Sequence, residues 1–262
     1  MDKLYIIKIG GNIIDDDARL VRFLQSFASV AGKKILVHGG GKLATRLAGQ
    51  MGVQQQLVDG RRITDAETLR IVTMVYAGQI NKHIVASLQS NNCNALGLTG
   101  ADGNSILAHK RKHASIDYGF VGDVDTVDTA LAAQLLGLGL TLVFAPITHD
   151  GQGQLLNTNA DTIAQELAKG LSRQYEVELI YSFEKKGVLL DATDDSTVIP
   201  AIGPAYYQTL KEQRKIYEGM IPKMDNAFAA LNNGVSKVII GNAEELDRLV
   251  TGESGTAITL DA

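Results

Sequence analysis

The chain begins with an apolar segment that carries one lysine and ends in two glycines. Residues 4–9 are apolar except for Lys8, and Gly10 and Gly11 follow at once. An unpaired ammonium group is costly near the end of a buried strand, so packing alone does not account for Lys8. Two glycines let the backbone turn sharply and bring bare N–H groups close to whatever the lysine faces. Such a strand end indicates an anion site, most suited to phosphate, or else an ordinary strand end whose lysine reaches solvent.

The same arrangement of strand and glycine turn occurs a second time. After the N-cap acceptors of 15–17, apolar residues at helical spacing cover 20–30. The buried strand 34–38 then runs directly into the glycines of 39–41 and a further helix. Because connections from a strand through a helix to a parallel strand are right-handed, the two strands should be parallel neighbours. Both glycine turns then lie at the carboxyl ends of parallel strands, where open α/β sheets bind their ligands.

Helices and strands alternate through the rest of the chain. A long helix should begin at Thr64, which has the pattern of a capping box with Glu67. Its apolar stripe over 69–88 could cover its own sheet or pair with a second subunit. The expected later elements are strands at 95–99, 106–111, 120–124, 140–146, 177–182, 187–190, 237–240 and 257–260, and helices at 127–137, from Asn159 as N-cap to about Gly170, and ending at Asn233. The pattern predicts an α/β fold with two lobes that share one continuous sheet.

Composition and charge exclude several classes of protein. The 262 residues carry a net charge of −4, which provides no electrostatic footprint for nucleic acid or for an anionic membrane surface. The single cysteine, Cys93, excludes an internal disulfide, and the five histidines lack metal-ligand spacing. No apolar run approaches the length of a membrane-spanning helix, and the first strand follows the N-terminus too closely for a signal peptide. We therefore expect a cytoplasmic protein that binds neither nucleic acid nor membranes.

The common nucleotide-binding motifs are absent, but the parts needed for phosphoryl transfer are present. Gly41 and Lys42 lack the spacing of a P-loop, and no GxGxxG pattern follows the first strand. The chain instead offers two glycine turns, the lysines Lys8 and Lys223, and Asp161 at the expected start of a helix. Phosphoryl transfer needs such cationic groups and backbone donors around a charged, in-line transition state.

Six short motifs follow one another along the chain. They are Lys8-Ile9-Gly10-Gly11, His38-Gly39-Gly40-Gly41, Gly60-Arg61-Arg62-Ile63-Thr64, Gly119-Phe120-Val121-Gly122-Asp123, Asn157-Thr158-Asn159-Ala160-Asp161 and Gly219-Met220-Ile221-Pro222-Lys223. In this order and over this length they resemble the motifs of the N-acetyl-L-glutamate kinases, a branch of the amino acid kinase family. The resemblance implies a three-layer sandwich with a mostly parallel central sheet flanked by helices. Residues from 1 to about 155 would bind the acylated amino acid, and those from about 156 to 262 would bind the nucleotide.

The resemblance also implies a reaction. This is the ATP-dependent phosphorylation of the γ-carboxylate of N-acetyl-L-glutamate to N-acetyl-L-glutamyl 5-phosphate, the second step of arginine biosynthesis. N-succinyl-L-glutamate and N-acetyl-α-aminoadipate are alternative acceptors, because no residue that can be read determines the volume around the acyl group. Kinases of aspartate, free glutamate or UMP fit the motifs less well. A catalytically silent sensor of the same fold would be expected to lack Lys8, Asp161 or Lys223, and all three are present.

Roles for individual residues follow from the same resemblance. Lys8 would stabilise the transferring phosphoryl group, Lys223 would stabilise the leaving oxygen, and Asp161 would hold both lysines in place. Arg62 would clamp a substrate carboxylate, which suits the forked guanidinium, although it could also be a solvated side chain. The other residues expected to bind are, for phosphate, Gly10, Gly11 and Gly40; for the acceptor substrate, Gly40, Gly41, Asn157 and Asn159; and for the nucleotide, Glu184, Gly187, Gly219 and Met220. The segment 183–187 departs from the family pattern, although Glu184 keeps its acidic residue.

Metal binding and assembly are likewise expectations from the family. Mg²⁺ should arrive with ATP and be held mainly by phosphate oxygens, so no protein ligand is assigned to it. A γ-carboxylate is ionised at neutral pH and is its own nucleophile, so no general base is needed. Relatives inhibited by arginine carry an extra N-terminal helix that builds a hexamer. This chain lacks that helix, which predicts a homodimer, joined through the long helix after Thr64 and insensitive to arginine.

Overall fold

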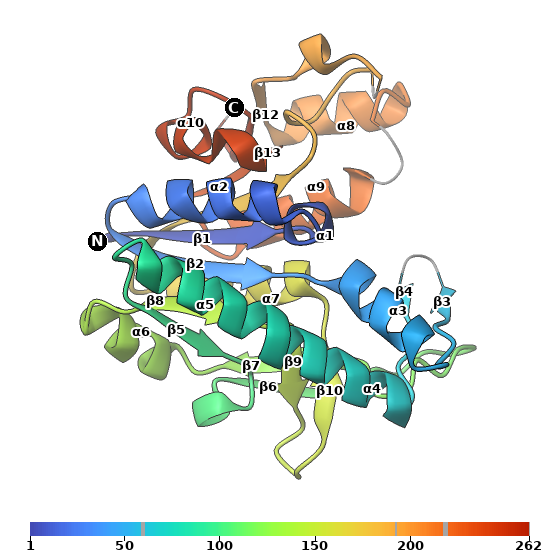
Figure 1. The fold of residues 1–262 in the computed structure, drawn as a ribbon. Helices are drawn as coiled ribbons and strands as arrows, with labels where there is room; N and C mark the ends of the chain where they lie inside the picture. The colour runs from blue at the N-terminus through green and yellow to red at the C-terminus, as the bar shows by residue number, and fades with distance from the viewer. Residues whose placement is uncertain (59–60, 192, 217–219, 262) are drawn as a thin grey trace.

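One eight-stranded sheet runs through the middle of the protein (Figure 1). The computed structural model describes residues 1–58, 61–191, 193–216 and 220–261. The strand order is β12-β14-β13-β11-β1-β2-β8-β5, and every pair is parallel except β13 with β14. The strands are β1 (Lys3–Ile9), β2 (Lys33–His38), β5 (Ala95–Leu98), β8 (Thr141–Phe144), β11 (Glu176–Phe183), β12 (Ala201–Ile202), β13 (Lys237–Asn242) and β14 (Thr256–Ile258). The sheet confirms the α/β class and the parallel pairing expected for the first two strands.

Helices cover both faces of this sheet, each over its own apolar core (Figure 1). One face packs against α6 (Thr129–Gly137), α7 (Ala160–Leu171), α8 (Pro204–Glu212) and α9 (Ile221–Asn232). The other face packs against α1 (Gly11–Ile14), α2 (Asp17–Ser29), α3 (Gly41–Gln50), α4 (Ala66–Thr73), α5 (Asn81–Ser90) and α10 (Leu246–Thr251). Alternation along β1 sends Leu4 and Ile6 into the first core and Ile7 and Ile9 into the second. Lys8 therefore lies on the face that α7 covers.

A smaller sheet lies below the main one in the view of Figure 1. Its order is β10-β9-β6-β7, and a separate two-stranded hairpin pairs β3 with β4. Their bounds are β3 (Leu57–Val58), β4 (Arg61–Arg62), β6 (Ile106–Lys110), β7 (Gly122–Val127), β9 (Ile147–His149) and β10 (Leu155–Asn157). One side of the main sheet comes from strands within 3–144 and the other from strands within 176–258. The assignment of these halves to two binding lobes stays a prediction.

The helical segment after Thr64 differs from the prediction in two ways. It consists of α4, the π-helical turn η1 (Met74–Ile80) and α5, rather than one regular helix. Its N-cap is Asp65, whose side chain accepts a hydrogen bond from the N–H of Thr68 at 2.8 Å, so the predicted capping box is wrong. Thr64 is fully buried, and its N–H donates to the carbonyl of Tyr118 at 3.0 Å. A residue held in this way by a neighbouring segment is not free to cap a helix.

Two further differences lie in the second half of the chain. The strand expected at 187–190 is absent, and within it only Leu189 forms an isolated bridge, to Val198. The helix α8 was not expected, although the Gly203-Pro204 pair at its start is a recognised helix-start signal. Within the described ranges, none of the helices is both long and apolar enough to cross a bilayer.

Candidate active site

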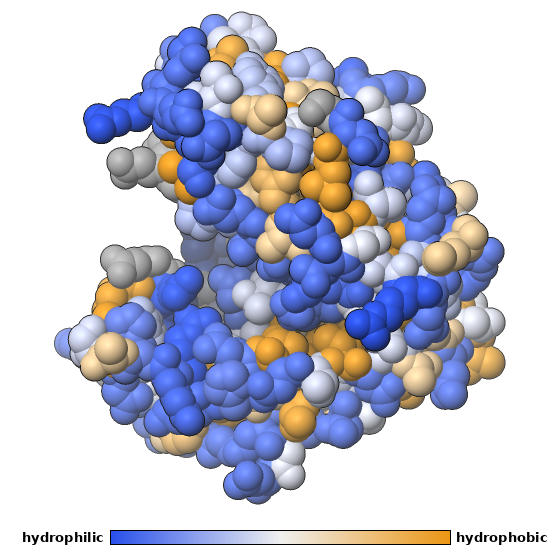
Figure 2. Space-filling view, turned by 180° about the vertical axis from the view of Figure 1, so that it is seen from behind, coloured by the Kyte–Doolittle hydropathy of each residue, from blue (hydrophilic) through white to orange (hydrophobic). Residues whose placement is uncertain are grey.

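A cleft of about 890 Å³ opens at the carboxyl ends of β1 and β2. Figure 2 shows the molecule hollowed at this edge, with hydrophilic side chains around the opening. The first turns of four helices border the cleft, through Gly11 of α1, Gly41 of α3, Ala160 of α7 and Pro222 of α9. The N–H groups of a helix's first turn have no partner within the helix, and the helix dipole adds positive potential there. The backbone alone therefore favours an anion in this cleft.

The side chains add much more positive charge to the same cleft. Seven of the described lining residues are cationic, namely Lys8, Lys42, Arg46, Arg61, Arg62, Arg111 and Lys223. Asp161 is the one carboxylate among the described lining residues. The chain as a whole has a net charge of −4, so this concentration of cations is local. A polyanionic ligand is the chemistry that it suits.

Lys8 and Asp161 form an ion pair at the inner wall of the cleft. The Lys8 Nζ atom lies 2.7 Å from Asp161 Oδ1, and both side chains are mostly buried. The pair forms because β1 turns Lys8 toward the face of α7, and Asp161 stands in the first turn of that helix. Asn159 is the N-cap predicted for this helix: its Oδ1 accepts from the N–H of Asp161 at 2.8 Å and of Thr162 at 3.2 Å. The cap thus holds the backbone that carries Asp161.

Lys223 also lines the cleft, in the first turn of α9, the helix that packs beside α7. Burial lowers the pKa of its ammonium group, and the nearby positive charge of Lys8 adds to this effect. The carboxylates of Asp161 and Glu184 act in the opposite direction. The structure thus brings the two predicted lysines and the predicted aspartate within electrostatic reach of one another. Their catalytic roles stay predictions.

The two glycine turns lie against each other beside Lys8. The N–H of Gly39 donates to the carbonyl of Ile9 at 3.2 Å, and a Cβ atom on Gly39 would stand 3.8 Å from the nitrogen of Gly11. Gly40 has φ +151°, and a Cβ atom there would lie 2.3 Å from Cδ1 of Ile80 in the π-helical turn. Backbone conformation and packing both require glycine at this position. Gly10 is the N-cap of α1 and stands just outside the cleft lining.

Arg62 is held at the start of α3. Its Nη2 atom donates to the carbonyl of Gly41 and to Oγ1 of Thr45, each at 2.9 Å, and its Nη1 atom donates to Gln55. Tyr76 from the π-helical turn also lines the cleft and lies beside this guanidinium. The guanidinium is therefore fixed in direction before any ligand enters.

Three of the predicted motifs meet beside the cleft. Asn157 donates from Nδ2 to Oγ1 of Thr64 at 3.0 Å, although 93 positions separate the two residues. The N–H of Phe120 donates to the carbonyl of Thr64 at 2.6 Å. A Cβ atom on Gly119 would stand 2.1 Å from that carbonyl oxygen, which explains the glycine. Asn157 and Asn159 both line the cleft.

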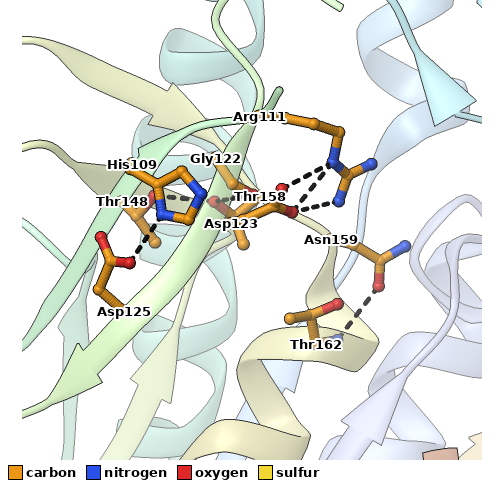
Figure 3. A network of polar contacts seen from close by, with 9 residues as sticks. All are labelled: His109, Arg111, Gly122, Asp123, Asp125, Thr148, Thr158, Asn159 and Thr162. Atoms are coloured by element: carbon orange, nitrogen blue, oxygen red, sulfur yellow. Dashed lines mark hydrogen bonds and ion pairs between the residues drawn. The ribbon is translucent and has the colours of Figure 1, made fainter. Parts of the chain in front are cut away.

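Arg111 is a cleft residue that sequence reasoning missed. Its Nε atom donates to both carboxylate oxygens of Asp123, at 3.0 and 3.1 Å, across the antiparallel strands β6 and β7. Figure 3 shows the Arg111 and Asn159 side chains on the same side of this network, and both residues line the cleft. The available signal was Asp123 in the fourth motif, which needs a cation as its partner. Lys42 and Arg46 were missed as well, because they stand on α3 outside any motif.

The residues predicted to bind the nucleotide lie outside the cleft lining wherever the structure describes them. Glu184 is exposed after β11, and Met220 is the N-cap of α9. Gly187 is buried, where a Cβ atom would stand 2.6 Å from Oγ1 of Thr256. Gly219 lies outside the described residues. Their part in nucleotide binding stays a prediction.

In the described part of the chain, no group of three or more His, Cys, Asp or Glu side chains is arranged to hold a metal ion.

Known proteins resemble this chain in both sequence and fold. A family model described as the amino acid kinase family matches residues 3–242. A curated protein named acetylglutamate kinase, from Cytophaga hutchinsonii, is 59% identical over 251 residues, which are 95% of each chain. Another of that name, from Bacteroides thetaiotaomicron, is 55% identical over 239 residues, covering 91% of this chain and 93% of the relative.

Solved structures show the same fold at lower identity. N-acetylglutamate synthase from Neisseria gonorrhoeae, complexed with coenzyme A and N-acetyl-glutamate, has a TM-score of 0.84 at 22% identity. That match covers 99% of this chain and 60% of the synthase chain. Carbamate kinase from Giardia lamblia bound to AMP-PNP has a TM-score of 0.69 at 13% identity and covers 98% of both chains. The family model and the relatives more than half identical over most of the chain together establish that the chain belongs to the amino acid kinase family.

Proposed function

We propose that this chain is an ATP-dependent kinase that phosphorylates the γ-carboxylate of N-acetyl-L-glutamate, giving N-acetyl-L-glutamyl 5-phosphate in the second step of arginine biosynthesis. Its relatives named acetylglutamate kinase are up to 59% identical to it among those compared above. The observation that carries the proposal is the ion pair of Lys8 with Asp161, beside the two glycine turns in a cleft whose described lining includes seven cationic side chains. That arrangement supplies charge stabilisation for phosphoryl transfer.

The reaction needs positioning and charge stabilisation rather than proton transfer. The γ-carboxylate is ionised at neutral pH and attacks the terminal phosphorus of ATP directly. Lys8 and the N–H groups at Gly11 and Gly40 stabilise the transferring group as negative charge spreads over its oxygens. Lys223 stabilises the oxygen that leaves with ADP, and Asp161 holds both lysines in place.

The acceptor lies on the side of the cleft formed by the first half of the chain. Arg62 binds a carboxylate of the acceptor, for which its fixed guanidinium is suited. Gly40, Gly41, Asn157 and Asn159 complete that subsite. The nucleotide lies on the side of the second half, near α9, with Glu184, Gly187, Gly219 and Met220 along its base and sugar.

Mg²⁺ enters with ATP and is held mainly by phosphate oxygens. The donor set of the cleft fits this, because its described lining offers one carboxylate, Asp161, which Lys8 already engages. Bound with ATP, the ion would offset phosphate charge during the transfer. The enzyme works in the cytoplasm as a homodimer joined through the helical segment 66–90, and arginine does not inhibit it. A hexamer in sedimentation equilibrium, or inhibition by arginine, would contradict this part of the proposal.

The reaction is tested by ADP release from Mg-ATP with four acceptors in parallel. These are N-acetylglutamate, N-succinylglutamate, N-acetyl-α-aminoadipate and free glutamate, with hydroxylamine added to trap the acyl phosphate. Turnover on N-acetylglutamate and none on free glutamate is the expected result. Faster turnover on N-succinylglutamate would support the proposed reaction but would change the acyl group assigned to the substrate from acetyl to succinyl. Silence on all four, from folded protein that still binds ATP, would support a sensor instead.

The Lys8→Arg variant tests the role of the first lysine. A guanidinium cannot reproduce the compact ammonium beside the transferring phosphoryl group, so kcat should fall by about 10²-fold or more. The affinity for the acceptor, measured by calorimetry, should change little. Lys3→Arg is the matched control, because Lys3 stands at the other end of β1 in an ion pair with Glu178. Unchanged kcat in the Lys8 variant would remove this lysine from the transition state.

A further inference from the structure

The aromatic ring of Phe183 lies against the Lys223 ammonium group. Lys223 Nζ is 4.4 Å from the centroid of the ring, which is within the range of a cation–π contact. Phe183 is the last residue of β11, and Lys223 stands in the first turn of α9 and lines the cleft, so the contact joins the sheet to the helix. The segment that begins at Phe183 is the one that departs from the family pattern.

Lys223 differs from Lys8 in how its charge is compensated. Lys8 has Asp161 at 2.7 Å, whereas no described carboxylate lies within ion-pair distance of Lys223. The charged groups that face Lys223 act from further away: Asp161 on α7, Lys8 on β1, and Glu184 just after β11. Burial meanwhile disfavours the charged form of this ammonium group. The face of the Phe183 ring, 4.4 Å from Nζ, is thus a group in direct contact that favours the cation.

We propose that Phe183 is a positioning residue, whose ring holds the ammonium group of Lys223 charged and directed into the cleft for phosphoryl transfer. This inference rests on the proposed kinase function. The ring also excludes water from one side of the ammonium group, which strengthens its electrostatic effect on the leaving oxygen. A lysine on a flexible stem would otherwise lose rotamer freedom each time it engaged the phosphates.

The variants Phe183→Leu and Phe183→Tyr separate this role from ordinary packing. Leucine keeps an apolar side chain but removes the ring, so kcat should fall by about 3- to 30-fold while the KM for the acceptor stays within twofold. The loss of the ring should also lower the pKa of Lys223, so the fall of kcat at alkaline pH should begin at a lower pH. Tyrosine keeps the ring and should restore both kcat and the pH profile.

Phe228→Leu is the matched control. Phe228 lies on α9 itself, and its ring stacks on Tyr207 with centroids 5.1 Å apart. A purely structural role for Phe183 predicts that both leucine variants lose stability and activity alike. The proposal predicts that only the Phe183 variant moves the alkaline limb of the kcat profile. Unchanged kcat and profile in Phe183→Leu, or no rescue by tyrosine, would overturn it.

A second measurement does not depend on turnover. Lys223 is labelled with an amine-reactive reagent across a pH series, and its modification is followed by mass spectrometry, which reports the pKa of this one lysine. The Phe183→Leu protein should show a lower midpoint than the wild type, and the Phe183→Tyr protein should not. If the wild type is inactive but the labelling midpoints of Lys223 still differ, the kinase proposal is rejected and the effect of Phe183 on Lys223 stands. An active wild type without the difference would reject the role of Phe183 alone.

Discussion

His38 lies fully buried beneath the second glycine turn, where it cannot carry charge at neutral pH. Burial lowers its pKa to about 4, and the nearby charge of Lys82 adds to the effect. Its Nδ1 atom donates to the carbonyl of Gly39 at 2.8 Å, so its Nε2 atom accepts from the side-chain amide of Asn81 at 3.3 Å. That amide also donates to the carbonyl of Val143 at 3.0 Å. The neutral ring thus connects the glycine turn to the helix behind it.

This burial makes stability depend on pH in a defined window. Between pH 6.5 and about 4 the unfolded chain binds a proton at His38 that the folded chain does not, so stability falls as pH falls. The loss should approach ~3 kcal/mol at the lower end of the window. Urea unfolding of the wild type and of His38→Gln at pH 7 and pH 4.5 measures it. An equal pH dependence in both proteins would contradict the assignment.

Tyr181 presents the opposite case of a buried group that lacks a partner. Its hydroxyl forms no hydrogen bond with the described residues, and burial raises its pKa. Tyr181→Phe removes the unsatisfied hydroxyl and should raise the free energy of unfolding by about 1 kcal/mol. Tyr207→Phe is the control, since its hydroxyl donates to Asp225 at 2.7 Å, and it should lower stability by about 1 kcal/mol. The urea unfolding midpoints of both variants, compared with that of the wild type, measure these changes. If Tyr181→Phe is less stable than the wild type, the Tyr181 hydroxyl has a hydrogen-bond partner.

At the scale of elements, helix ends show which local signals are reliable. Asn159 was predicted as an N-cap and is one, because the residue is free to turn its side chain onto the backbone that follows. Thr64 was predicted as an N-cap and is not, because its backbone is already paired with another segment and Asp65 takes its place. The local sequence shows which side chains are able to cap a helix. It does not show that the backbone of Thr64 pairs with a distant segment instead.

The cap of α2 is a direct test at this scale. The side chain of Asp16 accepts from the N–H of Arg19 at 3.0 Å, so Asp16→Ala should lower the free energy of unfolding by about 1 kcal/mol. Asp17→Ala is the control, because Asp17 contributes through the helix dipole alone and should cost about 0.3 kcal/mol. Thermal unfolding of both variants measures the difference. Equal losses would mean that charge, rather than the capping hydrogen bond, stabilises this end.

At the scale of the whole molecule, the distribution of charge separates the cleft from the remaining surface. Among the described residues, seven cationic side chains line the cleft of a chain whose net charge is −4. Such a focused field attracts anionic substrates, and salt weakens it.

Raising KCl from about 50 mM to about 500 mM shortens the Debye length from about 14 Å to about 4 Å, so the KM for both anionic substrates should rise several-fold. The value of kcat should change less, because the bound phosphates exclude much of the salt. Steady-state kinetics at matched Mg-ATP measures both constants. A KM that does not respond to salt would mean that the field of the cleft contributes little to binding.

The sequence by itself determined the α/β class, the parallel pairing of the first two strands, the two glycine turns at their ends and the cap at Asn159. The class, the turns and the cap follow from local spacing and backbone preference, and the parallel pairing follows from the handedness of a strand–helix–strand connection. Only the tertiary structure decided the contact of Asn157 with Thr64, the pairing of Arg111 with Asp123, and the ring of Phe183 against Lys223. Each of these contacts joins two different elements, and the way the strands pair and the helices pack on the sheet determines which of their side chains can meet.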